Sequence, residues 1–167
     1  MTFSLSLLAL AAVMSTAEVQ GDSVVPAGVL ARQDVSLELA NRLLDGVMSI
    51  CHAQGRSAVA AVVDRSGNLV ALQRDDFVGP HNTLAAQRKA YTALSAKTMT
   101  SVLAERARND PTSQNLNTLN ELLLLGGGVP LIIGGEIIGA LGVAGAGGSA
   151  NDEGCAIAAV RQHLPAD

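Results

Sequence analysis

The sequence predicts an α+β domain built around an antiparallel sheet. Apolar strand segments occur in pairs joined by short turns, and helical segments precede, separate and follow these pairs. Single strands that alternate with helices, which are typical of a parallel sheet, do not occur. The length of 167 residues fits one domain.

The clearest hairpin lies in the glycine-rich stretch Gly126–Gly148. The apolar runs Val129–Ile133 and Glu136–Ala144 flank Gly134 and Gly135, and a Gly-Gly pair accepts the positive φ angles of a tight turn. The other glycines of the stretch indicate a close approach by another part of the molecule or by a ligand. Close packing of a helix or a neighbouring subunit is the favoured interpretation, and a ligand contact is the alternative.

The remaining elements follow from periodicity and from turn residues. A second hairpin joins two apolar runs across a Ser-Gly-Asn turn, and helices are expected wherever apolar residues recur at helical spacing. In chain order the expected segments are a helix over Ser36–Gln54, strands over Ser57–Asp64 and Leu69–Arg74, a helix within His81–Lys97 capped by Asn82 or Thr83, a helix over Ser101–Asn109, a short strand over Leu122–Leu125 and a helix over Ala150–His163.

Composition excludes some partners and favours others. The net charge is −4, and Trp is absent, with one Tyr and two Phe, so the chain lacks both the net positive charge and the aromatic faces of a nucleic-acid platform. Only 16% of residues are charged and 49% are hydrophobic, which favours a homo-oligomer that hides part of its apolar surface.

The N-terminal segment predicts export. An apolar run that is too short to span a membrane ends at Ser15-Thr16-Ala17, which has the small residues of a signal-peptidase site. We expect a signal peptide over residues 1–17, a linker over 18–34 and a domain over 35–167, in a periplasmic or secreted protein. No Lys or Arg precedes the apolar run, so an attached amphipathic segment is the alternative.

The two cysteines, Cys51 and Cys155, match no zinc-site spacing. Two buried free thiols are the favoured interpretation. A disulfide is the alternative if the chain is exported.

The candidate ligand-binding residues lie at and beyond one strand-to-helix corner. His81 follows Gly79-Pro80, and an imidazole on a loop is a candidate metal ligand, whereas the other two histidines are expected at helix C-termini. Arg88 and Lys89 are candidates for binding ligand carboxylates, although a solvated face or pairing with an acidic residue (Asp75, Asp76 or Glu121) also explains them. Tyr91 is a candidate oxygen donor, hydrogen-bond donor or core residue.

Helix geometry separates the two adjacent cations. Neighbouring helix positions point about 100° apart, so Arg88 and Lys89 cannot face one pocket within a subunit. Arg88 shares a face with Leu84 and Tyr91, which makes it the expected ligand contact. Lys89 is then expected to pair internally or to reach a subunit boundary.

Three motifs together resemble one family. GPHNTLAAQRKAYTALSAKTMTS, LGGGVPLIIGGEIIGALGVAGAGG and NDEGCAIAAV are similar to the GlcG/HbpS-like haem-binding family, over about Val35–Leu164. The resemblance implies a profilin-like fold with a five-stranded antiparallel sheet and helices on both faces, homo-oligomers, and haem as cofactor. Arg88, Lys89 and Tyr91 match the family's helix motif, and His81 matches the loop before it.

The leading hypothesis is therefore an exported haem-binding protein with a role in haem sequestration, sensing or degradation. One alternative is an enzyme or accessory protein that acts on a small hydroxy or keto acid, with His81 or Tyr91 as general acid or base. Another is a structural oligomeric module with no haem role. Whether the protein turns over a substrate is left open.

Overall fold

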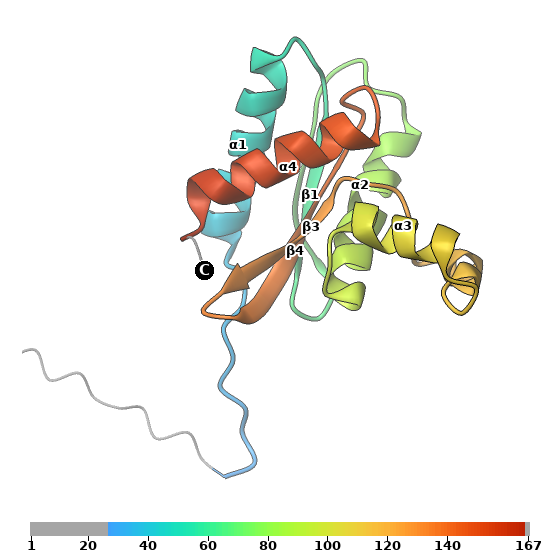
Figure 1. The fold of residues 1–167 in the computed structure, drawn as a ribbon. Helices are drawn as coiled ribbons and strands as arrows, with labels where there is room; N and C mark the ends of the chain where they lie inside the picture. Colours follow the sequence, from blue (N-terminus) through green and yellow to red (C-terminus); the bar gives the residue numbers. More distant parts are fainter. Residues whose placement is uncertain (1–26, 166–167) are drawn as a thin grey trace, which may run out of the picture. The chain divides into compact units, whose positions relative to one another are not determined.

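The structure, a computed structural model, describes residues 27–165. A compact unit begins at Arg32, and residues 27–31, which form no helix or strand, belong to a separate N-terminal unit. The expected signal peptide lies outside the described residues. Figure 1 shows the elements of the compact unit, which in chain order are α1 (Leu37–Ala53), β1 (Val59–Asp64), β2 (Leu69–Arg74), α2 (His81–Ala96), α3 (Thr100–Asn109), the 3-10 helix η1 (Gln114–Thr118), β3 (Gly128–Ile133), β4 (Glu136–Ala144) and α4 (Ser149–His163).

The sheet is antiparallel throughout, as the paired strands predict. Its order is β2-β1-β4-β3, with Val59 of β1 opposite both Arg74 of β2 and Ala144 of β4. Both expected hairpins are confirmed. Gly134 and Gly135 have φ angles of 58° and 75°, the left-handed conformation that a tight two-residue turn needs.

The sheet has four strands within residues 27–165, and the fifth strand implied by the family resemblance is not among them. The candidate segment Leu122–Leu125 does not pair with a strand. Its backbone is bonded to α2 side chains instead, because Arg88 donates to the Leu122 carbonyl at 2.6 Å and the Leu123 amide donates to Thr92 Oγ1 at 2.8 Å.

One face of the sheet packs against α2 at very short range. Ala86, Ala90 and Ala93 of α2 are fully buried there. A Cβ atom on Gly142 of β4 would overlap the Ala86 carbonyl oxygen, and one on Gly128 of β3 would overlap the Lys89 carbonyl oxygen. These strand glycines therefore serve helix packing, in agreement with the favoured interpretation.

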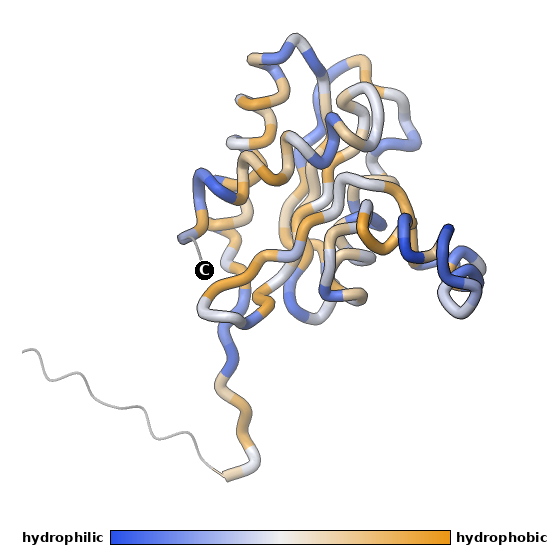
Figure 2. The backbone as a smooth tube through the Cα atoms, viewed as in Figure 1, coloured by the Kyte–Doolittle hydropathy of each residue, from blue (hydrophilic) through white to orange (hydrophobic). Residues whose placement is uncertain are grey.

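The opposite face is covered by α1 and α4, so helices lie on both faces (Figure 1). Leu43, Leu44 and Val47 of α1 are fully buried against alternate residues of the strands. Figure 2 shows the contrast between the hydrophobic strands in the centre and the hydrophilic turns of α3. No helix within residues 27–165 is long and apolar enough to cross a bilayer.

Cys51 of α1 and Cys155 of α4 form a disulfide, so the favoured interpretation of two free thiols is wrong. The two helices cross on the same face of the sheet and bring the Cα atoms to 5.8 Å, within the usual range for a disulfide. Residue spacing alone does not reveal this approach, because 104 positions separate the two cysteines.

The start of α2 also differs from expectation. The helix begins at His81 with Pro80 as its N-cap, and no side chain caps it. Asn82 and Thr83, the expected caps, lie inside the first turn, and the Asn82 side chain donates to the Gly79 carbonyl at 3.1 Å. His81 is consequently a helix residue held at the corner, not a loop residue.

Candidate functional site

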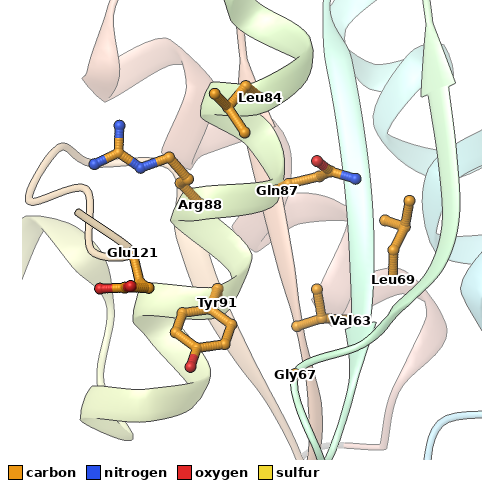
Figure 3. Close-up of a pocket in the computed structure, with 8 residues that line it drawn as sticks. All are labelled: Val63, Gly67, Leu69, Leu84, Gln87, Arg88, Tyr91 and Glu121. Atoms are coloured by element: carbon orange, nitrogen blue, oxygen red, sulfur yellow. The ribbon is translucent and has the colours of Figure 1, made fainter.

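A hollow of about 370 Å³ runs along the outer flank of α2. Leu84, Arg88 and Tyr91 lie on this flank, as their helical spacing predicts, and Val63 and Leu69 face them from β1 and β2 (Figure 3). The hollow forms because α2 covers the inner strands and leaves the α2-facing side of the edge strand β2 open. Gly67, Gln87 and Glu121 also line this hollow.

Arg88 is the cation of this hollow. Its guanidinium is anchored by the bond from Nη2 to the Leu122 carbonyl, and it extends toward the segment that carries Glu121 (Figure 3). Its Nε is buried and has no hydrogen-bond partner. A ligand would therefore meet the terminal nitrogens of this guanidinium, and a guanidinium held in place is suited to bind a carboxylate.

Tyr91 rests on the β1–β2 turn. A Cβ atom on Gly67 would lie 2.7 Å from Tyr91 Cε2, so the glycine makes room for the ring. Asp64 shapes this turn by accepting bonds from the amides of Ser66 and Asn68, both at 2.8 Å. Burial raises the pKa of Asp64, but the hydrogen bonds from Asn68 and Ser66 outweigh burial and hold the pKa below its usual value.

Lys89 is placed quite differently from Arg88. It is 1% exposed, and its ammonium lies 2.7 Å from Asp152 Oδ2 and 2.9 Å from the Val143 carbonyl. The other carboxylate oxygen of Asp152 accepts from the Ala146 amide at 2.8 Å. This ion pair fixes the β4–α4 connection to α2, so Lys89 pairs internally, one of the two outcomes expected for it.

His81 lies at the start of α2 beside a second hollow of about 330 Å³. Lys89 and Asp152 line this hollow as well, together with the glycines that precede α4. The four candidate residues are therefore divided between two hollows, with His81 and Lys89 at one and Arg88 and Tyr91 at the other.

His81 and Arg88 nevertheless share one stripe of the helix surface. They are two turns apart, about 10.5 Å along the axis and within about 20° of the same direction. Leu84 lies between them and is 59% exposed. We call these three residues the α2 stripe: an imidazole, an apolar contact and a guanidinium in a row.

Sequence reasoning missed Asp152 as the partner of Lys89. The acidic residues considered as partners were Asp75, Asp76 and Glu121, and Asp152 was not among them. Asp152 lies in the first turn of α4, directly after a glycine loop, and no local pattern in the sequence brings it to Lys89. Within residues 27–165, no group of three or more His, Cys, Asp or Glu side chains is arranged to hold a metal ion.

Residues 35–161 match the family model described as haem-degrading protein, HbpS-like. Protein GlcG of Escherichia coli K12 is 33% identical over 109 residues, which span 65% of this chain and 80% of that protein. A 15.0 kDa protein from the dhaT-dhaS intergenic region of Citrobacter freundii is 28% identical over 113 residues, spanning 66% of this chain and 80% of that protein.

Solved structures with the same fold include HbpS. A double mutant of HbpS from Streptomyces reticuli is 33% identical, with a TM-score of 0.75 over 83% of this chain and 92% of that one. A PduOC–haem complex has a TM-score of 0.70 over 76% of this chain and 93% of that one. At a sequence identity of 23%, this structural likeness shows a shared fold alone.

Proposed function

The chain belongs to the family of haem-degrading HbpS-like proteins, and from this membership together with the α2 stripe we propose that it binds haem on the outer flank of α2. The observation that carries the proposal is the order of side chains along the stripe. An imidazole, an exposed leucine and an anchored guanidinium match the iron, the apolar ring and a propionate of haem in kind and in sequence.

The three contacts have different physical roles. His81 is exposed and offers an axial nitrogen. Leu84 and Leu69, which are 59% and 47% exposed, supply apolar surface for the porphyrin. Arg88 offers its guanidinium, which the bond to the Leu122 carbonyl holds in place, to a propionate, while Lys89 is occupied by Asp152 and is not available.

Haemin titration of the apo-protein tests the propionate contact. Arg88→Ala should weaken binding by about 10- to 100-fold, the effect of losing one hydrogen bond to a charged group, with little change in the spectrum. Arg108→Ala is the matched control because Arg108 is an exposed arginine on α3, away from the hollow. Equal haemin affinities for the two variants would exclude Arg88 from the site.

The spectrum tests the axial contact separately. His81→Ala should shift the Soret band as well as weaken binding, because the iron loses a strong-field nitrogen. If His81→Ala keeps the wild-type spectrum, Tyr91 or Thr98 becomes the candidate. Thr100 is unsuitable because it is fully buried and accepts a hydrogen bond from the Gly128 amide at 2.8 Å.

We propose further that the protein is exported and acts in a periplasmic or extracellular compartment. The small residues that end at Ala17 and the Cys51–Cys155 disulfide both favour this location, since structural disulfides persist in oxidising compartments. The mature protein should begin after Ala17. Intact-mass spectrometry that finds residues 1–17 on the mature protein would contradict the proposal.

The proposed role of haem binding is sequestration, sensing or degradation of haem. We also propose that the protein assembles as a homo-oligomer. Low charge and apolar side chains on the α2 flank favour self-association. Time-resolved absorption with a reductant and oxygen distinguishes the roles: loss of the Soret band with release of iron indicates degradation, and a stable spectrum indicates sequestration or sensing.

A second candidate function rests on the second hollow. His81, the Lys89–Asp152 pair and two helix N-termini that lack side-chain caps surround it, and such termini favour a small carboxylate. Calorimetric titration with 2-hydroxy and 2-keto acids tests this candidate. Saturable binding that His81→Ala abolishes would favour a small organic acid as the ligand over haem.

A further inference from the structure

The segment Glu121–Leu125, which forms no helix or strand, reaches both hollows beside α2. Its first residue, Glu121, lines the hollow that contains Arg88. Its last residue, Leu125, lines the hollow that contains His81. Each end of the segment therefore lies at one of the two polar ends of the α2 stripe.

Hydrogen bonds hold the backbone of this segment against α2. The Leu122 carbonyl accepts from Arg88 Nη2 at 2.6 Å. The next amide, that of Leu123, donates to Thr92 Oγ1 at 2.8 Å. Thr92 is fully buried, and its hydroxyl donates in turn to the Arg88 carbonyl at 2.6 Å. The segment is thus tied to the helix that carries the stripe, so the side chains at its two ends keep their places beside that helix.

Leu125 adds apolar surface at the His81 end. It is 47% exposed, and it lines the second hollow together with His81 and Ala85 of α2. Leu84, the exposed leucine of the stripe, precedes Ala85 in the helix. A flat apolar ring on the stripe would therefore contact leucines from two separate elements, and covering both side chains is favourable.

Glu121 adds a negative charge at the Arg88 end. It is exposed, and within residues 27–165 its side chain makes no hydrogen bond or ion pair. Figure 3 shows its carboxylate on the same side of α2 as the Arg88 guanidinium. A ligand carboxylate that binds Arg88 therefore meets a second negative charge in the same hollow, and like charges repel.

We propose that the Glu121–Leu125 segment is the second wall of the haem site, with Leu125 against the porphyrin and Glu121 as a specificity-determining residue. The inference rests on the haem binding proposed above. The two ends of the segment have opposite effects: Leu125 strengthens binding of any porphyrin through apolar contact, whereas Glu121 weakens binding of a porphyrin with free carboxylates. Glu121 therefore keeps haem binding weaker than Arg88 and the leucines alone would make it, which favours release.

Titration with haemin and with haemin dimethyl ester separates the two effects, because the ester has the same ring and iron but no free carboxylate. Leu125→Ser should weaken binding of both compounds by about 5- to 20-fold, since most of one leucine contact is lost. Leu119→Ser is the matched control, because Leu119 is equally exposed but lines neither of the two hollows. If the two variants bind both compounds equally well, the apolar wall is absent and the inference is overturned.

Glu121→Gln should act in the opposite direction and on haemin alone. We expect haemin to bind about 3- to 10-fold more tightly at low salt, because a like charge near the propionate is removed. The gain should shrink as salt is added, and the dimethyl ester should bind as it does to wild type. Glu105→Gln, which changes an exposed glutamate on α3, is the matched control and should alter neither affinity. An unchanged or weaker haemin affinity of Glu121→Gln, or an equal gain for the ester, would contradict the inference.

The wild-type titration tests the haem proposal itself. If wild type shows no saturable binding of haemin, that proposal is wrong and the inference falls with it. If wild type binds haemin and the variants lack their opposite effects, the inference alone is overturned. Amide hydrogen exchange of the wild-type protein supplies a measurement that needs no variant. The amides of residues 121–125 should exchange more slowly with haemin bound, and unchanged exchange there would show that haemin does not lie against the segment.

Discussion

The Cys51–Cys155 disulfide should be a major source of stability. It joins α1 to α4 and closes a loop of 104 residues. Constraining the unfolded chain with a loop of this length is worth about 4.7 kcal/mol, and removing a native disulfide usually costs about 2–5 kcal/mol. Replacing both cysteines by alanine should therefore lower the melting temperature by roughly 10–20 °C.

Urea denaturation of wild type and Cys51→Ala/Cys155→Ala measures this effect. The free energy of unfolding should fall by about 2–5 kcal/mol. The m value should rise, because an unfolded chain without the cross-link is less compact and exposes more surface. A loss below about 1 kcal/mol, or an unchanged m value, would refute the loop-entropy reasoning. A thiol assay that finds two reactive cysteines in the denatured, unreduced wild-type protein would show that the bond is absent.

Two further perturbations test the packing of α2. Gly142→Ala should destabilise the protein by about 1–3 kcal/mol, because the added methyl group meets the backbone of α2. Gly154→Ala, in the open middle of α4, should instead stabilise the protein by about 0.5–1 kcal/mol. Equal thermal stabilities of the two variants would contradict this packing. Lys89→Met should lower the free energy of unfolding in urea by about 3–5 kcal/mol, because it leaves the Asp152 carboxylate buried and unpaired. The double variant Lys89→Met/Asp152→Leu should recover much of that loss. A single variant as stable as wild type would exclude a structural role for the pair.

Local signals predicted most of the fold. Gly134 and Gly135 between β-branched runs determine a hairpin through backbone geometry alone, and the helix over Leu37–Ala53 follows from one apolar face with Ser36 as its cap. The disulfide and the absence of a fifth strand from residues 27–165 were not predictable in this way. Both depend on contacts between distant segments, such as the bonds from α2 to the Leu122–Leu123 backbone.

The candidate site was predictable only in part. Helical spacing separates Arg88 from Lys89 and groups Arg88 with Leu84, and the structure has both features. The partner of Lys89 is set by the path of the β4–α4 connection, which no local pattern specifies. The positions of Glu121 and Leu125 beside α2 likewise depend on bonds between distant segments.

Pulsed electron paramagnetic resonance of the ferric haem complex tests the central claim most directly, that haem binds the α2 stripe through His81. The protein would be labelled with ¹⁵N-histidine, and His52→Gln serves as the control because His52 lies in the last turn of α1, on the opposite face of the sheet from α2, and is bonded to Asp75. We predict an axial ¹⁵N coupling in wild type and in His52→Gln that is absent in His81→Ala. A ¹⁵N coupling that survives in His81→Ala, or no ¹⁵N coupling in wild type, would contradict the claim.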